Sequence, residues 1–305
     1  MQYLTFGSAG RQASVIGAGM MRIAGMDFAQ ADTFVRTAIE NGVTIFDHAD
    51  IYGGGQSERI FGQVLANDPS LRDQVFLQSK CGIRPGQFDF SKEYILEAVD
   101  GILSRLETDH LDSLLLHRPD ALMEPEEVGE AFEILHASGK VLDFGVSNMN
   151  PMQMQLLQSG LPFPIAADQV QMSIAHTPML NFGFNVNMTN DPAIDRDGGV
   201  LEYCRLHHII VQTWSPLQIG FFGGPFLGNE QYPELNALLN DLAEQYNVGA
   251  DTIAYAWLLR YPASMQVITG TTNPERIASA AKAGDITLTR KEWYQIYLAA
   301  GNRLP

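Results

Sequence analysis

The segment 46–58, FDHADIYGGGQSE, contains two aspartates, a histidine, a tyrosine and three consecutive glycines. These residue types allow three kinds of chemistry. Carboxylates and an imidazole bind divalent metals, a tyrosine with a suitable neighbour transfers a proton, and consecutive glycines turn the chain or surround a phosphate. The choice between them depends on which side chains the neighbouring elements bring to this segment.

Short apolar segments recur along the chain, and segments with helical periodicity lie between them. The clearest predicted strands are 43–49, 75–81, 111–117, 143–148, 167–172, 209–217 and 266–270. The segment 285–289 is a weaker candidate for an eighth strand. The predicted helices include 31–42, 57–65, 91–108, 124–140 and 151–159.

Apolar runs that alternate with helices are typical of a parallel sheet whose two faces are both covered. About eight such units in roughly 300 residues, without a linker, predict an α/β protein in which the whole chain, 1–305, forms a single (β/α)₈ TIM barrel. A doubly wound open sheet is the alternative, but no predicted strand is followed by GxGxxG. The segment 3–19 precedes the first predicted strand, and we expect it to form a β-hairpin that turns at 8–10 and closes the barrel floor.

The active site of such a barrel lies at the C-terminal ends of its strands. Polar residues of this sequence concentrate at those ends, whereas the strand interiors are sparsely polar. The residues at the ends are Asp47, His48, Asp50, Lys80, Cys81, His117, Arg118, Ser147, Asn148, Gln169, Gln171, Trp214, Ser215, Gly270 and Thr271.

Four residues near these ends form a coherent acid–base set: Asp47, Tyr52, Lys80 and His117. A phenol with a pKa near 10 is a weak acid, but an adjacent ammonium stabilises the phenolate, so we expect Lys80 to lower the pKa of Tyr52. A paired aspartate would hold the lysine in place, and a histidine would orient a carbonyl oxygen or pass a proton. Such a set would protonate a carbonyl oxygen as hydride reaches the carbonyl carbon.

The composition restricts the partners of this chain. The formal charge is -16, from 35 acidic and 19 basic residues, and the basic residues form no run, which argues against nucleic acid and against an anionic membrane surface. There are two cysteines and no CxxC pair, no apolar run of about 20 residues and no signal-peptide pattern at the start. We therefore expect a cytoplasmic protein that acts on a small molecule; nothing in the sequence indicates a protein partner.

The segments FDHADIYGGGQSE, SKCG, LLLHRPD, FGVSN, DQV and ITGTTNPERI occur in this order. Together they resemble the aldo-keto reductase superfamily over nearly the whole chain, and DHADIYGG with LLHRPD is similar to bacterial oxidoreductases of that superfamily. The resemblance implies NADPH-dependent reduction of an aldehyde or ketone. It also implies that Tyr52 donates the proton, with Asp47, Lys80 and His117 in support.

The resemblance further implies a cofactor site. Ser147, Asn148 and Gln169 would hold the nicotinamide carboxamide, Trp214 would stack on the nicotinamide ring, and Arg276 would bind the 2′-phosphate, which suits a planar guanidinium. The implied cofactor-binding residues are Met21, Ser147, Asn148, Gln169, Trp214, Ser215, Leu217, Thr271, Thr272, Asn273 and Arg276. A helix that begins at Asn273 and Pro274 would add its positive end.

Several positions depart from the family pattern. Gly270 stands where many relatives have lysine, Ser279 and Ala280 replace a common Glu-Asn pair, and Asp168 stands where asparagine usually precedes the glutamine. The expected preference for NADPH over NADH therefore rests mainly on Arg276.

Two other functions remain open at this stage. A metal-dependent hydrolase would use His48, Asp50 and His117 at the barrel mouth, although the chain lacks an HxH pair after its first predicted strand. A non-catalytic subunit that binds nucleotide and senses redox state would have the same fold and the same residues.

The surroundings of the site can also be predicted. The glycines 53–55 turn the chain into a helix that Ser57 would cap. The short segment 118–127 and the short tail predict an open pocket for varied aldehydes or ketones, and 181–199 either covers it or lies at its rim. The expected walls are Tyr52, Phe88, Phe90, Trp214, Phe221 and Phe222.

Overall fold

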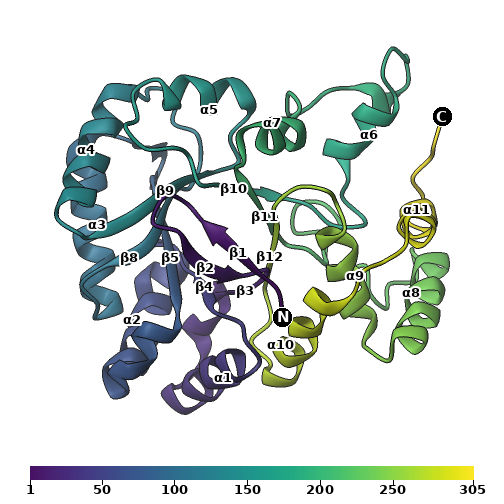
Figure 1. The fold of residues 1–305 in the computed structure, drawn as a ribbon, viewed down its shortest axis with the longest axis horizontal. Coiled ribbons are helices and arrows are strands. Elements are labelled where there is room, and N and C mark those ends of the chain that lie inside the picture. The colour runs from purple at the N-terminus through teal and green to yellow at the C-terminus, as the bar shows by residue number, and fades with distance from the viewer.

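The computed structural model describes residues 1–305 and contains a closed barrel of parallel strands, in the order β10-β11-β12-β3-β4-β5-β8-β9 (Figure 1). This confirms the predicted (β/α)₈ TIM barrel. In chain order the barrel strands are β3 (Ile16–Gly19), β4 (Ile45–Asp47), β5 (Phe76–Cys81), β8 (Leu111–Leu116), β9 (Val141–Ser147), β10 (Ala167–Gln171), β11 (Ile210–Trp214) and β12 (Met265–Thr269).

Helices surround the barrel, and the helices predicted from periodicity correspond to α1 to α5. None of the helices is both long enough and apolar enough to cross a membrane. Their bounds are α1 (Phe28–Glu40), α2 (Gln56–Asn67), α3 (Lys92–Leu106), α4 (Pro125–Ala137), α5 (Pro151–Gln158), α6 (Pro178–Phe184), α7 (Val200–His207), α8 (Pro233–Tyr246), α9 (Ala250–Leu259), α10 (Pro274–Ala281) and α11 (Arg290–Ala299).

The eighth barrel strand is not the predicted one. The segment 285–289 forms no strand, because Asp285 is the last residue of the short helix Lys282–Asp285 and the side chain of Thr289 caps α11. The strand that completes the barrel is instead β3, the first barrel strand in the chain, which lies in the segment that we expected to precede the barrel. It pairs in parallel with β12 on one side and with β4 on the other, so the barrel closes without 285–289.

The glycines of β3 explain why this strand was missed. Glycine has a low intrinsic preference for strands, so VIGAG does not resemble one. The packing nevertheless requires glycine. A Cβ atom at Gly17 would lie 2.8 Å from Ile268 and 2.9 Å from Ile45, and one at Gly19 would lie 2.7 Å from the carbonyl oxygen of Thr269. The close approach of neighbouring strands therefore selects residues that local preference disfavours.

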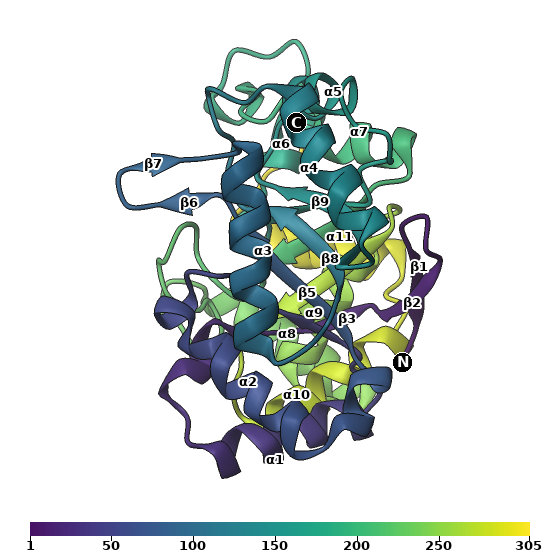
Figure 2. The ribbon, with the colours of Figure 1, turned by 90° about the vertical axis from the view of Figure 1, so that its left-hand side faces the viewer.

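The predicted hairpin forms the barrel floor. It consists of β1 (Tyr3–Phe6) and β2 (Arg11–Ser14), and Figure 2 shows it on the opposite side of the molecule from the hairpin of β6 (Ile83–Arg84) and β7 (Gln87–Phe88). Buried Phe6 packs against Phe76 at the start of β5, with ring centroids 4.7 Å apart. The floor is thus closed by side chains, and the cavity described below opens at the other end.

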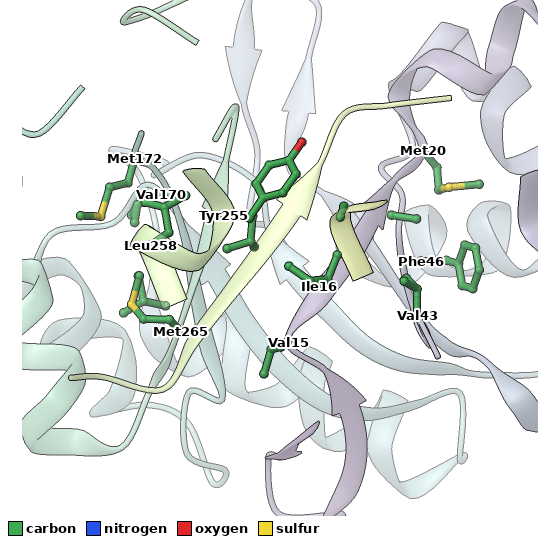
Figure 3. Packing of buried hydrophobic residues seen from close by; sticks show 14 of the residues in the cluster. Val15, Ile16, Met20, Val43, Phe46, Val170, Met172, Tyr255, Leu258 and Met265 are labelled. Carbon is green, nitrogen blue, oxygen red and sulfur yellow. The ribbon is translucent and has the colours of Figure 1, made fainter. Parts of the chain in front are cut away.

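The outer core lies between the strands and the helices. Figure 3 shows members of this core that come from β3, β4, β10 and β12, such as Ile16, Phe46, Val170 and Met265. Phe46 packs on Phe61 of α2, with ring centroids 5.2 Å apart. Because this packing anchors the barrel strands to the helices, the strand ends at the mouth form a rigid frame for a site.

Candidate active site

A cavity of about 1920 Å³ opens at the C-terminal ends of the barrel strands. Its lining includes Asp47 from β4, Ser147 from β9, Gln169 from β10, Trp214 from β11 and Thr269 from β12. Pockets for single small ligands usually measure roughly 300–1,000 Å³. This cavity therefore has room for an extended ligand and a second, smaller molecule beside it.

Asp47, Tyr52, Lys80 and His117 come together at the base of this cavity. Lys80 is fully buried, and its Nζ lies 2.7 Å from each carboxylate oxygen of Asp47. The same ammonium donates to the carbonyl oxygen of His48 at 2.9 Å and to the Tyr52 hydroxyl oxygen at 3.4 Å. The rings of Tyr52 and His117 lie edge to face, 6.0 Å apart, and both line the cavity. One buried cation thus contacts both the carboxylate and the phenol.

The protonation states of this cluster follow from burial and from the Asp47–Lys80 pair. Burial is the largest effect on Lys80 and opposes its charge, but the charge interactions and hydrogen bonds with Asp47 and Tyr52 together outweigh it, so the pKa of Lys80 is raised. Burial also raises the pKa of Tyr52, and it outweighs the opposing effect of Lys80. The prediction that Lys80 brings this pKa below its ordinary value is therefore wrong. Burial, aided by the charge of Lys80, lowers the pKa of His117 well below its ordinary value. At neutral pH the phenol is protonated, the lysine charged and the imidazole neutral.

The glycines after Tyr52 turn the chain from β4 into α2. Gly53 and Gly54 have φ angles of 59° and 64°, a left-handed conformation that residues with a Cβ atom rarely adopt. A Cβ atom at Gly53 would also lie 2.5 Å from the Cβ atom of Ala24. The prediction that Ser57 caps this helix is wrong, because the helix already begins at Gln56 and Ser57 lies inside it. The Ser57 hydroxyl instead donates to the carbonyl oxygen of Met21 at 3.3 Å. The glycines therefore allow the sharp change in chain direction directly after Tyr52.

A network of buried glutamines lies beneath Asp47 inside the barrel. Gln78 donates to Asp47 at 2.6 Å, and it exchanges two hydrogen bonds of 2.9 Å with Gln212. Gln212 donates to Gln266 at 2.7 Å. Gln169 donates to Asp47 at 3.2 Å and to Gln212 at 2.9 Å. Because both hydrogens of the Gln169 side-chain amide are used in this way, the group that this side chain presents to the cavity is its carbonyl oxygen.

We expect the replacement of Gln78 by methionine to destabilise the protein by about 2–4 kcal/mol, because it removes two buried donors and leaves the Gln212 amide partly unpaired. The free energy of unfolding from urea titration measures this change. Gln245→Met is the control, since Gln245 is exposed on α8 and such changes are usually within about 0.5 kcal/mol. Equal effects of the two substitutions would show that the network adds nothing to stability.

The residues predicted to bind a carboxamide also form one cluster. Asn148 donates to Ser147 at 2.7 Å, and the indole of Trp214 donates to Asn148 at 3.2 Å. Asn148 and Ser215 have φ angles of 59° and 51°, so two residues with side chains adopt a left-handed conformation at the cavity wall. Backbone strain of this kind is concentrated at functional sites, which supports a binding role for this wall.

The remaining predicted cofactor residues divide into two groups. Met21, Leu217, Thr271 and Arg276 line the cavity together with the cluster just described. Thr272 and Asn273 do not line it. The side chain of Asn273 instead accepts a hydrogen bond from the backbone of Arg276 at 3.0 Å, which confirms the predicted start of α10. The prediction that Thr272 and Asn273 contact the ligand has no support from this geometry.

The departures from the family pattern have different surroundings. Gly270 lines the wall without supplying a cation, and Arg276 lines it nearby. The hydroxyl of Ser279 lies 2.9 Å from that of Thr252 in α9, so it faces a helix. Asp168 is fully buried, and burial raises the pKa of its carboxyl to about 7. Arg276 is thus the guanidinium available at this end.

Most predicted walls are present. Phe88, Phe221 and Phe222 line the cavity with large exposed fractions, but Phe90 is buried and does not line it. A Cβ atom at Gly82 would lie 2.5 Å from the Phe90 ring, so this phenylalanine fills the space beneath that loop. From the segment 181–199, only residues near its end, 196 and 197, line the cavity, which places the segment at the rim.

The residues of the metal alternative are not assembled. His48 is fully buried against Phe61, with ring centroids 4.8 Å apart, and burial lowers its pKa to about 3. Asp50 accepts a hydrogen bond from Tyr94 at 3.1 Å. No group of three or more His, Cys, Asp or Glu side chains in residues 1–305 is arranged to hold a metal ion.

Sequence reasoning did not single out Gln78 or Gln212. A signal was present, because each glutamine follows two apolar residues at the start of a predicted strand, in FLQSKC and IVQTW. Arg118 was recognised only as a residue at a strand end, and it lines the cavity beside His117.

The fold is a (β/α)₈ barrel, and the cavity at its mouth lies beside a cluster of buried ionisable side chains. The model of the Aldo/keto reductase family matches residues 15–299, and the chain belongs to this family of oxidoreductases. Oxidoreductase YdhF from Escherichia coli K12 is 36% identical, with 98% of each chain covered. A 6-dehydroglucose reductase from Agrobacterium fabrum is 36% identical, with 92% of each chain covered. The crystal structure of an aldo-keto reductase from Klebsiella pneumoniae in complex with NADPH matches with a TM-score of 0.80 and 25% identity, covering 100% of this chain and 96% of that one.

Proposed function

We propose that this protein reduces aldehyde or ketone carbonyls with NADPH, and that Tyr52 donates the proton. The observation that carries the proposal is the position of the Tyr52 hydroxyl, which lines the cavity 3.4 Å from a buried ammonium and near a neutral imidazole. This arrangement holds a proton at neutral pH and stabilises the negative charge left behind when the proton is transferred.

The chain has groups that fit the cofactor at both ends of the cavity. Gln169 presents its carbonyl oxygen, and Ser147 and Asn148 add polar groups beside the Trp214 ring, which suits a carboxamide on a planar ring. At the other end Arg276 lines the cavity and forms no salt bridge, which suits a phosphate. When bound, NADPH would supply the hydride.

The reaction then depends on the acid–base cluster. The carbonyl oxygen of the substrate would accept hydrogen bonds from Tyr52 and from His117, which fixes its orientation in the cavity. As negative charge develops on this oxygen, the Tyr52 proton moves to it and the phenolate forms. Lys80 stabilises the phenolate, and Asp47 keeps Lys80 in position through two contacts of 2.7 Å.

Cofactor titration tests the first half of the proposal. We expect NADPH to quench tryptophan fluorescence with at least tenfold tighter binding than NADH, and Arg276→Met to weaken NADPH binding by about 10- to 100-fold while changing NADH binding little. Trp214→Phe is the control for the origin of the signal. The other two tryptophans, Trp257 and Trp293, stack on each other in the core and keep their fluorescence.

Turnover with a carbonyl panel tests the second half. The panel contains aromatic aldehydes, short aliphatic aldehydes and oxidised sugars, because one relative is named as a 6-dehydroglucose reductase. NADPH consumption that depends on the carbonyl compound supports the proposal. Tight NADPH binding without turnover of any member would instead favour the non-catalytic, redox-sensing subunit. If neither NADPH nor NADH binds, the proposal is contradicted.

A further inference from the structure

Arg118 is a half-buried cation in the cavity without an acidic partner. It follows His117 directly after β8, and both residues line the cavity. Its guanidinium lies over the ring of Trp214, with the guanidinium carbon 5.8 Å from the ring centroid. The lysine and arginine side chains that pair with carboxylates are Arg11, Arg36, Arg72, Lys80, Arg84, Lys92, Arg105 and Lys140, so Arg118 is not among them.

The acid two residues after Arg118 and the three acids that line the cavity make their hydrogen bonds to other groups. Asp120 accepts hydrogen bonds from the backbone of Phe90 and of Leu122, each at 2.9 Å. Asp47 pairs with Lys80. The cavity acid Asp197 accepts from two backbone groups at 3.1 and 3.2 Å, and Asp251 accepts from the backbone of Thr252 at 2.9 Å. None of these carboxylates forms a salt bridge with Arg118, so its charge has no direct counter-ion in the protein.

A guanidinium that loses hydration without gaining a counter-ion is unfavourable in the empty protein. Burial lowers the pKa of Arg118, and no acid opposes this effect. The other arginines that line the cavity, Arg22, Arg196 and Arg276, are exposed to solvent. Of the cavity arginines, Arg118 is thus the one whose charge a bound anion would stabilise most. It lies beside the acid–base cluster, whereas Arg276 lies at the opposite end of the cavity.

We propose that Arg118 binds a carboxylate of the substrate, so that the preferred substrates are carbonyl compounds bearing a carboxylate, that is, oxo acids and semialdehydes. This inference rests on the proposed carbonyl reduction. A planar guanidinium accepts a carboxylate in bidentate geometry, which orients the rest of the molecule toward His117 and Tyr52. The protein carries a formal charge of -16, so an anionic substrate needs a local cation of this kind at the reacting centre. The exposed rings of Phe221 and Phe222 offer an apolar rim for the body of such a substrate.

A pair of nearly isosteric aldehydes tests the inference: 4-carboxybenzaldehyde and its neutral methyl ester. We expect the wild-type protein with NADPH to reduce the acid with a kcat/KM about 10- to 100-fold higher than the ester. Arg118→Met should remove this preference by lowering kcat/KM for the acid alone, and Arg118→Lys should restore part of it, since lysine keeps the charge but not the bidentate geometry. Most of the change should appear in KM, because the contact is made in the bound substrate before the reaction as well as during it.

Arg22→Met is the matched control, because Arg22 also lines the cavity but is exposed and is assigned no role. It should leave the acid-to-ester ratio unchanged. Affinity for NADPH should be the same in the wild type and in Arg118→Met. If Arg118→Met loses NADPH affinity, Arg118 belongs to the cofactor site and the inference is overturned.

The outcomes separate this inference from the function on which it rests. Equal reduction of the acid and the ester by the wild type, with no change in Arg118→Met, would overturn the carboxylate site and leave the carbonyl reductase intact. Failure of the wild type to reduce either aldehyde, or any member of the wider carbonyl panel, would instead count against the reductase itself.

Discussion

Tyr52→Phe is expected to lower the turnover of aldehyde reduction by about 10²- to 10⁴-fold, the range associated with the loss of a positioned acid. The substitution keeps the ring that packs edge to face with His117 and removes only the hydroxyl that lies 3.4 Å from Lys80. Steady-state rates at saturating NADPH measure the effect. The dissociation constant for NADPH should stay within about twofold, because no cofactor contact is assigned to this hydroxyl.

Tyr255→Phe is the control for this result. Tyr255 also lines the cavity, but it belongs to α9 and none of the hydrogen bonds of the acid–base cluster involves it. Its hydroxyl should therefore be dispensable for turnover at saturating NADPH. Comparable losses in the two variants, or loss of NADPH binding in Tyr52→Phe, would contradict the role assigned to Tyr52.

Lys80→Met is expected to lower turnover strongly and also to reduce the free energy of unfolding by about 3–5 kcal/mol. Both effects have one cause. The substitution leaves the carboxylate of Asp47, 2% exposed, without its counter-ion and removes the cation that stabilises the Tyr52 phenolate. Urea titration measures the stability, and NADPH consumption with an aldehyde measures the turnover.

The double variant Asp47→Asn/Lys80→Met separates the two effects. It removes both charges, and the asparagine carbonyl oxygen can still accept from Gln78 and Gln169, so most of the lost stability should return. Turnover should remain low, because the phenolate still lacks a cation. Recovery of turnover together with stability would show that Lys80 acts only in folding, and full activity of Lys80→Met would remove its catalytic role altogether.

The barrel was predictable because its strands are apolar on both faces and its helices are amphipathic, and both properties are local. Seven barrel strands, 43–49 among them, were recognised in this way. The strand Ile16–Gly19 was not, because its glycines are chosen by the close packing against Ile45 and Ile268, which lie far away in the sequence. A periodicity rule detects burial along one segment and does not detect the space that distant segments leave.

In the candidate site too, some features were predictable from the sequence and others were not. The order of residue types at the strand ends was sufficient to select Asp47, Tyr52, Lys80 and His117, because a barrel brings the ends of all its strands to one mouth. The sign of the Tyr52 pKa shift was predicted wrongly. Charge proximity can be guessed from motifs, whereas the burial that outweighs it depends on the whole surrounding structure.

The sequence by itself determined the barrel, the floor hairpin and the grouping of the four candidate acid–base residues, because these depend on periodicity and on residue types near strand ends; its ordered motifs carried the resemblance to the family. Only the tertiary structure decided that Gln78 and Gln212 support Asp47, that Thr272 and Asn273 do not line the cavity, and that Arg118 lacks an acidic partner. Those properties depend on distances between segments and on which polar groups remain unpaired after folding, and neither quantity is encoded in any single stretch of the chain.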